Sequence, residues 1–521
     1  MSKRALYQPG LLAQLLCLLL ALAACSQAAS AEAISVSVTA DGESRAVSVA
    51  AGSRVSDALQ AAGVTLGPLD RSEPHSLAQL ADGDEIRVVR VEEAYEVEEQ
   101  ALPFVSRTLQ NEALTVGEQR LIQNGVNGLE EVTYRLLYED GELVSRTAVR
   151  SQVITPPVEE IVMIGAQSSF SAVTIPGRLA FLAGGNAWLL EDNTGARQAL
   201  VTTGDLDGRI FEISPDGDWL LFSRASEVEG QINTLWVVSL NDLRLIELGV
   251  ANVVHYAGWA PGGDATQIAY STVEPSPNPP GWAANNDLWF INFTPGGEVT
   301  EPRQGLPARR TDSLYSWWGS AYAWSADGET LAFTRPDAIG SADIDTDRLQ
   351  TLLALTPYQT NSHWAWMPTL AWGDDGWLYT VEHAEQSGVE SQQRSQLFDL
   401  VALSPQGELR RLAQNVGMFA NPAPEPGGGQ VAYLRAFTPT QSDISSYELM
   451  VITSEGGNSM ALFPPQGAAG LQPQRLAWSP SADAGGMIAF VYQGNLWLVN
   501  VLSGEARQLT GDGLVSAVSW E

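Results

Sequence analysis

Seven copies of one short turn motif occupy the second half of this chain, and they restrict its fold more than any other feature. In most copies a predicted strand ends near a Trp or Pro, and an Asp-Gly or Gly-Gly turn comes next. An apolar run such as Leu331-Ala332-Phe333 then follows. Short apolar strands that recur with glycine punctuation predict four-stranded units arranged around an axis. The copies lie at residues 212–217, 259–263, 324–328, 372–376, 424–428, 478–480 and 519–521. Residues 177–521 are therefore predicted to form a seven-bladed β-propeller.

The two ends of the repeated region predict how the ring closes. The first repeat lacks its leading strand, and the last residues form a strand with no repeat after it. We expect the strand at Leu514–Trp520 to pair with the strand at Leu179–Phe181. This pairing leaves no sheet edge open to other chains.

The repeat resembles a known family through Trp324-Ser325-Ala326-Asp327-Gly328 followed by Leu331-Ala332-Phe333. Turns of this type resemble the TolB-type propeller repeat, which is also found in relatives of prolyl oligopeptidase. Those relatives hydrolyse peptides with a separate α/β-hydrolase domain whose nucleophile lies in a Gly-x-Ser-x-Gly turn. The chain has no such turn. Peptidase activity of that kind is therefore not expected.

Residues 33–91 predict a small α+β domain. Apolar residues alternate on both sides of Asp41-Gly42, which is typical of a hairpin. Ser53 precedes a run with helical spacing that ends at Gly63, and a further strand follows Asp82-Gly83. The segments Val38-Thr39-Ala40-Asp41-Gly42 and Leu80-Ala81-Asp82-Gly83-Asp84-Glu85-Ile86 make this region similar to the ubiquitin-like domain that accompanies G-five domains. The resemblance implies a ubiquitin-like fold.

Residues 92–165 read as extended chain with few apolar groups, which predicts a thin β structure without a thick core. Pro156-Pro157-Val158-Glu159-Glu160-Ile161 and Gln123-Asn124-Gly125-Val126-Asn127-Gly128 resemble the G-five domain, whose five glycines correspond here to Gly117, Gly125, Gly128, Gly141 and Gly165. This family occurs in cell-surface proteins, and the resemblance implies an elongated β domain. The family has been linked to N-acetylglucosamine-containing glycans and to zinc, but the residues themselves indicate neither ligand. Residues 166–176 are predicted to be a linker.

The first 24 residues predict a leader that directs export. Lys3 and Arg4 precede an apolar run from Leu11 to Leu22, which is too short for a spanning helix of ~20 residues. Leu22-Ala23-Ala24-Cys25 resembles a bacterial lipobox, which implies cleavage before Cys25 and acylation of its sulfur and its new amine. An ordinary secretory signal and an uncleaved anchor are the alternatives. A linker at residues 25–32 would follow, and the protein would lie outside the cytoplasm, lipid-anchored to the outer face of the cell membrane.

Charge and residue types exclude several classes of function. The formal net charge of −33 repels nucleic acid phosphates and anionic headgroups, so the acylated Cys25 is the expected contact with the bilayer. We expect no cofactor and no metal. Three aspartates, Asp343, Asp345 and Asp347, match the first positions of a calcium-binding loop, but the residues that follow do not match its later positions. This mismatch favours a solvated loop. The four histidines, His75, His255, His363 and His383, are expected to be surface or loop residues.

Tryptophans outside the repeat positions are the candidate ligand-binding residues. Loop aromatics on a rigid ring can stack on a glycan or bind a protein, although the same residues can simply cover the blade ends. The candidates are Trp282, Trp317, Trp318, Trp364 and Trp366, and no catalytic residue is assigned. The chain is thus expected to be a cell-envelope binding protein, with a stalk that contacts wall glycan and a propeller that binds protein or saccharide. A glycan-active enzyme with its site in the propeller channel, or a mechanical spacer without a small ligand, remain alternatives.

Overall fold

The computed structural model describes residues 32–111, 114, 117–165, 170–261, 266–309, 315–480 and 486–521. The leader, Cys25 and almost all of the linker at 25–32 lie outside these residues. The chain divides into two compact units, one of Met1–Leu109 with Arg120–Met163 and one of Gln110–Gln119 with Ile164–Glu521. Among the described residues, no helix has both the length and the apolar character needed to cross a bilayer.

The first unit begins with the expected ubiquitin-like domain. Its sheet has the order β2-β1-β4-β3, with β1 antiparallel to β2 and parallel to β4. Asp41 and Gly42 both have positive φ, which is the backbone a two-residue hairpin requires. The helix α2 begins after Arg54, not Ser53, because the Arg54 N–H donates to the carboxylate of Asp57 at 2.8 Å. The elements are β1 (Ala33–Ala40), β2 (Glu43–Ala50), α2 (Val55–Ala61), β3 (Arg71–Glu73) and β4 (Glu85–Val89).

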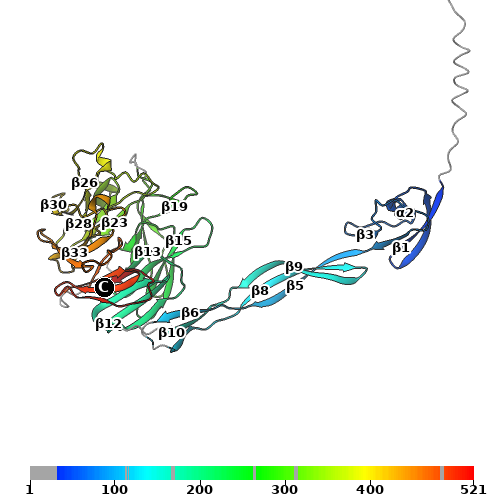
Figure 1. Ribbon diagram of the computed structural model, residues 1–521, viewed down its shortest axis with the longest axis horizontal. Helices are drawn as coiled ribbons and strands as arrows, with labels where there is room; N and C mark the ends of the chain where they lie inside the picture. Colours follow the sequence, from blue (N-terminus) through cyan, green and yellow to red (C-terminus); the bar gives the residue numbers. More distant parts are fainter. Residues whose placement is uncertain are drawn as a thin grey trace, which may run out of the picture. The chain divides into compact units, whose positions relative to one another are not determined.

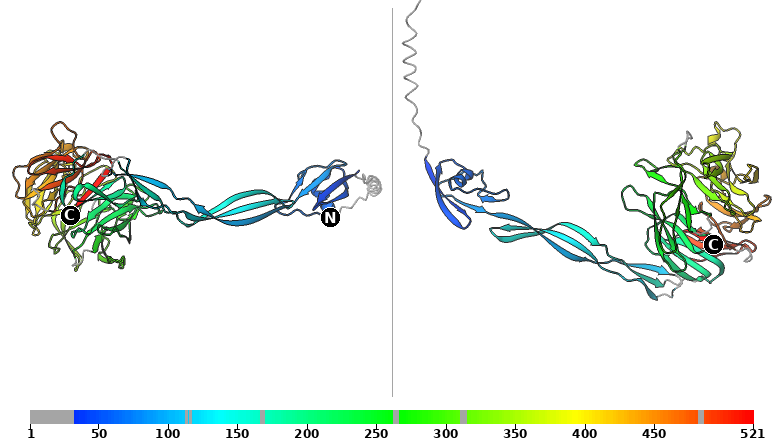
Figure 2. Two further views of the ribbon diagram at one scale, coloured as in Figure 1. Left: turned by 90° about the horizontal axis from the view of Figure 1, so that it is seen from below. Right: turned by 180° about the vertical axis from the view of Figure 1, so that it is seen from behind.

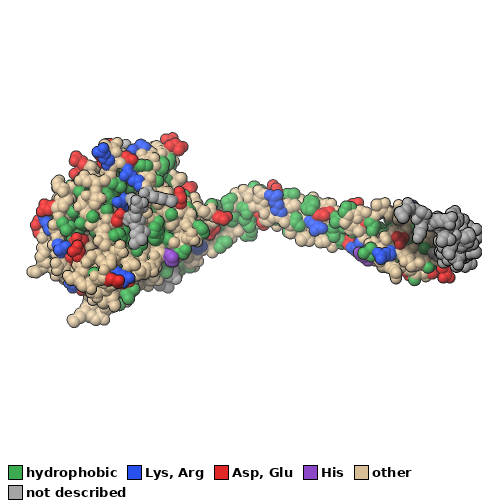
Figure 3. Space-filling model, turned by 90° about the horizontal axis from the view of Figure 1, so that it is seen from above, with side chains coloured by type: hydrophobic (Ala, Val, Ile, Leu, Met, Phe, Trp, Pro, Cys, Tyr) green, Lys and Arg blue, Asp and Glu red, His purple; other side chains and the backbone are tan. Residues whose placement is uncertain are grey.

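The G-five region forms two three-stranded sheets, as its low apolar content predicts. The orders are β5-β8-β9 and β6-β10-β7. Strand β9 is exposed along its whole length, and hydrophobic side chains lie at the surface of this region (Figure 3). In place of a core, side chains on neighbouring strands contact one another at the surface. For example, the Arg146 guanidinium lies 3.6 Å from the Tyr134 ring centre. The strands are β5 (Val91–Leu102), β6 (Ser106–Asn111), β7 (Gln119–Gln123), β8 (Gly128–Glu139), β9 (Glu142–Thr155) and β10 (Glu160–Gly165).

Seven sheets form the blades of a propeller in the described part of the second unit (Figures 1 and 2). Their orders are β12-β11-β39, β13-β14-β15-β16, β17-β18-β21-β22, β23-β24-β25-β26, β27-β28-β29-β30, β31-β32-β33-β34 and β35-β36-β37-β38. A separate hairpin, β19-β20, projects from the third of these sheets. The prediction of a mainly β chain with a seven-bladed propeller is confirmed.

The strand bounds of the propeller follow in chain order. They are β11 (Thr174–Ala183), β12 (Asn186–Val201), β13 (Leu206–Ile213), β14 (Trp219–Ala225), β15 (Asn233–Ser239), β16 (Leu245–Ala251), β17 (Ala257–Trp259), β18 (Gln267–Tyr270), β19 (Val273–Pro275), β20 (Trp282–Ala284), β21 (Leu288–Asn292), β22 (Arg303–Leu306), β23 (Ala321–Trp324), β24 (Leu331–Arg335), β25 (Ala338–Asp343), β26 (Arg348–Ala354), β27 (Ala371–Trp372), β28 (Leu378–His383), β29 (Phe398–Leu403), β30 (Leu409–Ala413), β31 (Ala423–Pro424), β32 (Gln430–Ala436), β33 (Tyr447–Thr453), β34 (Met460–Phe463), β35 (Ala477–Trp478), β36 (Met487–Tyr492), β37 (Asn495–Asn500), β38 (Ala506–Gln508) and β39 (Val515–Trp520). Two short 3-10 turns, η1 (Gln392–Arg394) and η2 (Pro439–Gln441), lie in loops.

The ring closes between the last strand and the first, as predicted. Strand β39 pairs antiparallel with β11, with Leu179 opposite Trp520 and Phe181 opposite Val518. The Trp520 indole N–H donates to the Pro176 carbonyl at 2.8 Å. Strand β39 also contacts β13 and β35, the innermost strands of the neighbouring blades. The closing sheet is therefore built from both ends of the repeated region.

Three of the repeated tryptophans link their blade to the one before it. The indole N–H groups of Trp259, Trp372 and Trp478 donate to the carbonyls of Glu212, Ala323 and Ala423, at 3.2, 3.0 and 2.8 Å. Each acceptor lies on the first strand of the preceding blade. Burying the ring and satisfying its single donor together explain why the motif uses Trp at this position.

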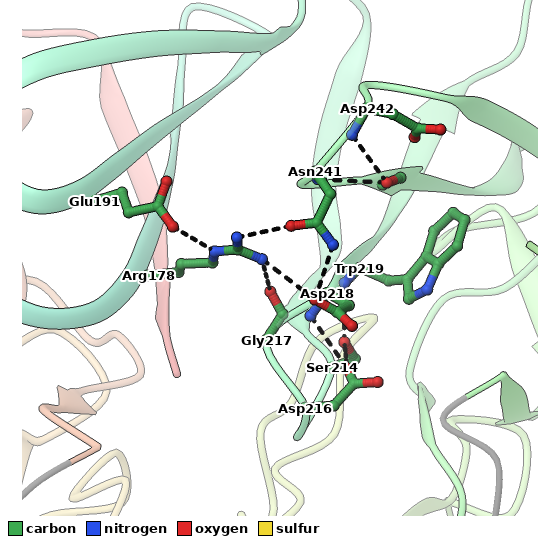
Figure 4. Close-up of polar contacts among 10 residues, drawn as sticks. Arg178, Glu191, Ser214, Asp216, Gly217, Asp218, Trp219, Asn241 and Asp242 are labelled. Carbon is green, nitrogen blue, oxygen red and sulfur yellow. Dashed lines mark hydrogen bonds and ion pairs between the residues drawn. The ribbon is translucent and has the colours of Figure 1, made fainter.

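A cluster around Arg178 joins the closing blade to the next one (Figure 4). From β11, its guanidinium bonds Glu191 at 2.8 Å within the same blade. It also donates to the Gly217 carbonyl at 2.8 Å and to Asn241 at 2.7 Å in the next blade. The Asn241 amide in turn donates to Asp218 at 2.9 Å. One side chain thus fixes the turn at 214–218 against the closing sheet.

The antiparallel order of each blade assigns the loops to two opposite faces. Turns between first and second strands, such as 214–218, lie on one face. Loops between second and third strands share the other face with the segments that join blades. We call this second face the connector face. Its longest segments are residues 271–287, 307–320, 355–370, 384–397 and 464–476.

Candidate functional site

All five predicted ligand-binding tryptophans lie in segments of the connector face. Trp282 begins β20 in the long insertion between β18 and β21, and Trp317 and Trp318 lie in the segment after β22. Trp364 and Trp366 lie in the segment between β26 and β27. The structure places these residues in two separate groups, which differ in what they can do.

The first group, the His255 cluster, consists of His255, Trp282, Tyr315, Trp317 and Trp318. The ring centres of His255, Trp282 and Trp318 lie 5.2–5.9 Å apart, and that of Trp317 lies 5.8 Å from Trp318. The three tryptophans are half-buried, so each keeps part of its surface exposed. The sequence named these three tryptophans as separate candidates, and the structure brings them together with His255 and Tyr315.

Burial governs the chemistry of His255. Its Nε2 and the indole Nε1 of Trp282 are buried and have no hydrogen-bond partner among the described residues. The pKa of His255 is lowered to about 4, chiefly by desolvation and also by the Arg209 charge, while a hydrogen bond with the Trp318 backbone opposes the shift. Gly319, at φ 147°, packs so closely on this ring that an added Cβ would lie 2.3 Å from it. His255 is therefore a loop residue, as expected, but it is half-buried and packs as a neutral ring at pH 7.

We predict that His255 makes the propeller sensitive to mild acid. The folded protein keeps this imidazole neutral down to about pH 4, whereas the unfolded chain takes up the proton near the ordinary value of 6.5. Between these values the unfolded state binds more protons, so the free energy of unfolding falls as the pH is lowered. The expected loss due to this group is on the order of 2–3 kcal/mol.

Denaturant unfolding between pH 7 and pH 4 measures this effect. A His255→Asn variant should show a shallower loss than the wild type, because its side chain does not titrate. The control is His363→Asn, which replaces an exposed histidine outside the His255 cluster. Equal slopes for wild type and His255→Asn would contradict the prediction.

The second group contains one tryptophan that does not fit the binding prediction. Trp366 is 2% exposed, its ring lies 4.9 Å from Phe398, and its indole N–H donates to the Met418 carbonyl at 2.8 Å. It has no free face for a ligand and belongs to the core between two blades. Trp364, two residues earlier, is half-buried and lies 6.5 Å from Phe419.

His383 is also buried, which corrects the expectation of a surface or loop histidine. It ends strand β28, and cross-strand pairing with Phe398 turns its ring into the core. Its Nδ1 lies 2.6 Å from the Thr356 carbonyl and its Nε2 lies 3.0 Å from the Ser395 carbonyl. One ring thus ties the segment 355–370 to the loop 384–397.

Two carboxyl groups on inner strands were not singled out by the sequence. Desolvation raises the pKa of Glu212 on β13, and it raises the pKa of Glu521, which follows β39, to about 7, although Glu521 as a whole residue is exposed. The Glu212 charge contributes to the second shift. Their strands are neighbours in the ring only because the propeller closes, so nothing in their sequence spacing indicates the pair.

The aspartates at 343–347 have partners of their own. The carboxylate of Asp343 accepts hydrogen bonds from the Asp345 N–H at 3.0 Å and from the Thr346 hydroxyl at 2.6 Å. Asp347 pairs with Arg309. These contacts support a solvated turn rather than a calcium loop. Over the residues that the structure describes, no group of three or more His, Cys, Asp or Glu side chains is placed to hold a metal ion.

Comparisons with known proteins match the first unit to two domain families. Residues 36–74 match the G5-linked ubiquitin-like domain, and residues 93–167 match the G5 domain. The resuscitation-promoting factor RpfB of Mycolicibacterium smegmatis is 27% identical over 113 residues, which cover 22% of this chain and 31% of that protein. The chain therefore spans less than a third of the length of this relative.

Solved structures resemble each part of the chain separately. The crystal structure of HP0197-G5 is 21% identical and covers 15% of this chain and 99% of its own, with a TM-score of 0.14. A prolyl endopeptidase structure is 12% identical and covers 65% of this chain and 49% of its own, with a TM-score of 0.42.

Proposed function

We propose that this protein is a lipid-anchored binding protein of the cell envelope, held outside the cytoplasm through Cys25. The observation that carries the proposal is the pairing of a G5-linked ubiquitin-like domain with a G5 domain, because this family occurs in cell-surface proteins. In this role the first unit contacts wall glycan. The propeller binds a protein or a saccharide through its connector face.

The chemistry of the connector face supports the binding role of the propeller. Trp282, Trp317 and Trp318 keep part of their rings exposed on rigid blade connections, which suits stacking on the apolar face of a sugar ring. Trp364 adds a further half-buried ring. The net charge of −33 disfavours nucleic acid as the partner.

Co-sedimentation of the full-length lipoprotein with purified, insoluble peptidoglycan tests this function. Burying a large apolar side chain is worth about 1.5–3 kcal/mol, so the double variant Trp317→Ala, Trp318→Ala should bind at least about tenfold more weakly. The control is Trp377→Ala, a half-buried tryptophan at the opposite face whose ring packs under Arg410. Binding that is equal in both variants, with unchanged thermal unfolding, would count against the connector face.

An enzyme with its site in the propeller channel is the second candidate function. The pKa of Glu521, which is raised to about 7 by desolvation and by the Glu212 charge, favours it, since a protonated carboxyl group near neutral pH can act as a general acid. The same incubation, assayed for released soluble fragments, separates the two functions. Fragment release that is lost in Glu212→Gln would establish an enzyme, and binding without release supports a binding protein. Absence of both would favour a mechanical spacer.

A further inference from the structure

A polar pocket lies on the connector face between the segment 355–370 and the loop 384–397. Its volume is about 400 Å³, within the range of small-molecule sites. The residues that line it are Tyr358, Gln359, Asn361, Arg394 and Gln396. None of them was singled out by the sequence, because they come from two segments that are far apart along the chain.

The lining has an unusual chemistry for this protein. It offers a phenol, three primary amides and a guanidinium, with no carboxylate, although the chain carries a net charge of −33. Amides and phenols both donate and accept hydrogen bonds, as sugar hydroxyls do. The only formal charge in the lining is positive. A ligand with several hydroxyls and one negative group therefore matches it.

The loop that carries Arg394 and Gln396 is held in place by its own side chains. Gln392 bonds both the N–H and the carbonyl of Gln386, at 3.0 and 3.1 Å. The Gln386 side chain accepts from the Gln396 N–H at 2.8 Å, and the Ser395 hydroxyl donates to the Ala384 carbonyl at 2.6 Å. Such bonds fix the loop before a ligand arrives, which lowers the entropy cost of binding.

Arg394 is oriented but keeps an exchangeable partner. Its Nε donates to Gln359 at 3.1 Å, which points the guanidinium along the pocket wall. One terminal nitrogen pairs with Glu390 at 2.7 Å, and the Glu390 side chain is 80% exposed. An exposed pair of this kind contributes little to stability. A ligand carboxylate can replace Glu390 without leaving a buried charge behind.

Two amides of the lining are available to a ligand. The side chains of Gln396 and Asn361 make no hydrogen bond to the part of the chain that the structure describes. Trp364 belongs to the same segment, where its carbonyl accepts a bond from the Thr360 hydroxyl at 2.6 Å. The amides are thus available for ligand hydroxyls, and a half-buried ring lies on the same segment as the pocket lining.

We propose that this pocket binds a saccharide that carries a free carboxylate. The amides and Tyr358 bind the hydroxyl and N-acetyl groups, and Arg394 binds the carboxylate. The inference rests on the proposed function, because it names the ligand of the propeller within the cell envelope. A phosphate ligand fits less well, since one guanidinium is the whole positive charge of the lining.

Isothermal titration of the full-length protein with two disaccharides tests the proposal. The first probe is the N-acetylglucosamine–N-acetylmuramic acid disaccharide, whose lactyl carboxylate is free. The second is N,N′-diacetylchitobiose, which lacks this carboxylate. We expect one-to-one binding of the first probe and about tenfold weaker binding of the second, as expected for loss of one charge-assisted hydrogen bond.

Variants locate the binding. Arg394→Gln should remove the difference between the two probes, and Gln396→Ala should weaken both. The matched control is Arg507→Gln, because Arg507 is half-exposed and pairs with exposed Glu505 in another blade. Asn361→Gly, which tolerates the positive φ of 52° at this exposed position, provides a third variant if a loop change impairs folding, which thermal unfolding reports.

Three results would overturn the proposal: equal affinity of the wild type for both probes, unchanged affinity in the pocket variants, or no heat with either probe. The outcome is separable from that of the proposed function. If the wild type sediments with peptidoglycan but ignores the disaccharides, only the pocket assignment fails. If it does not sediment, wall binding fails, while carboxylate-dependent disaccharide binding that the variants abolish still supports the pocket.

Discussion

Truncation after Leu514 is expected to abolish cooperative folding of the propeller. The truncation removes β39, which supplies the innermost strand of the closing sheet and every pairing of Leu179–Ala183 with its last neighbour. It also removes Ser519, whose hydroxyl accepts from the Ile213 N–H at 2.9 Å in the next blade. Without this strand, β11 loses its paired neighbour, and β13 and β35 lose the strand that they contact in the adjacent blade. A ring stabilised by contacts between neighbouring blades then becomes an open array with exposed edges.

A point variant tests the contacts that close the ring without shortening the chain. Trp520→Ala keeps the backbone pairing but removes a buried indole and its hydrogen bond to Pro176, with an expected loss of 3–5 kcal/mol on the scale of large-to-small core changes. Trp377→Ala, outside the closing sheet, should cost clearly less. Tryptophan fluorescence and calorimetry measure both. A truncated protein with the wild-type melting temperature would show that the ring does not depend on this strand.

The blades were predictable because their signal is local. Each blade contains an apolar triplet, a glycine turn and a second apolar strand, and each needs only its neighbours in sequence to be recognised. Closure was predictable because the first repeat lacks its leading strand and the last strand has no partner in a repeat of its own. The start of α2 was missed by one residue because Arg54 uses its backbone N–H with Asp57, which a search for small polar caps does not detect.

The binding site was only partly predictable because burial depends on neighbouring blades. Trp364 and Trp366 look alike in sequence, yet only Trp366 inserts beside Phe398 and bonds the Met418 carbonyl from the next segment. His383 reads as an isolated histidine, and its role appears only when strand β28 places it between two loops. Likewise, the pocket lined by Tyr358 and Gln396 is formed by two segments, neither of which contains a recognisable binding motif.

Replacement of Cys25 by serine is expected to remove all fatty acid from the protein. The leader offers no other firm attachment, since its apolar run from Leu11 to Leu22 is too short to span the bilayer. The negative charge of the protein opposes contact with anionic headgroups, so attachment depends on the acyl chains, each worth about 0.8 kcal/mol per buried CH₂. Two or more chains give stable anchoring. Metabolic labelling with palmitate should therefore mark the wild type and leave Cys25→Ser unlabelled.

Cys17 provides the matched control because it is the other cysteine of the chain and lies within the leader. Cys17→Ser should keep the label and the membrane association of the wild type. Mass analysis of the mature amino terminus then distinguishes the three interpretations of the leader. An acylated terminus at Cys25 establishes the lipoprotein, an unmodified terminus indicates an ordinary secretory signal, and an intact Met1 indicates an uncleaved anchor. Label retained in Cys25→Ser would refute the assignment of the acylated thiol, and with it the tether on which the proposed envelope role depends.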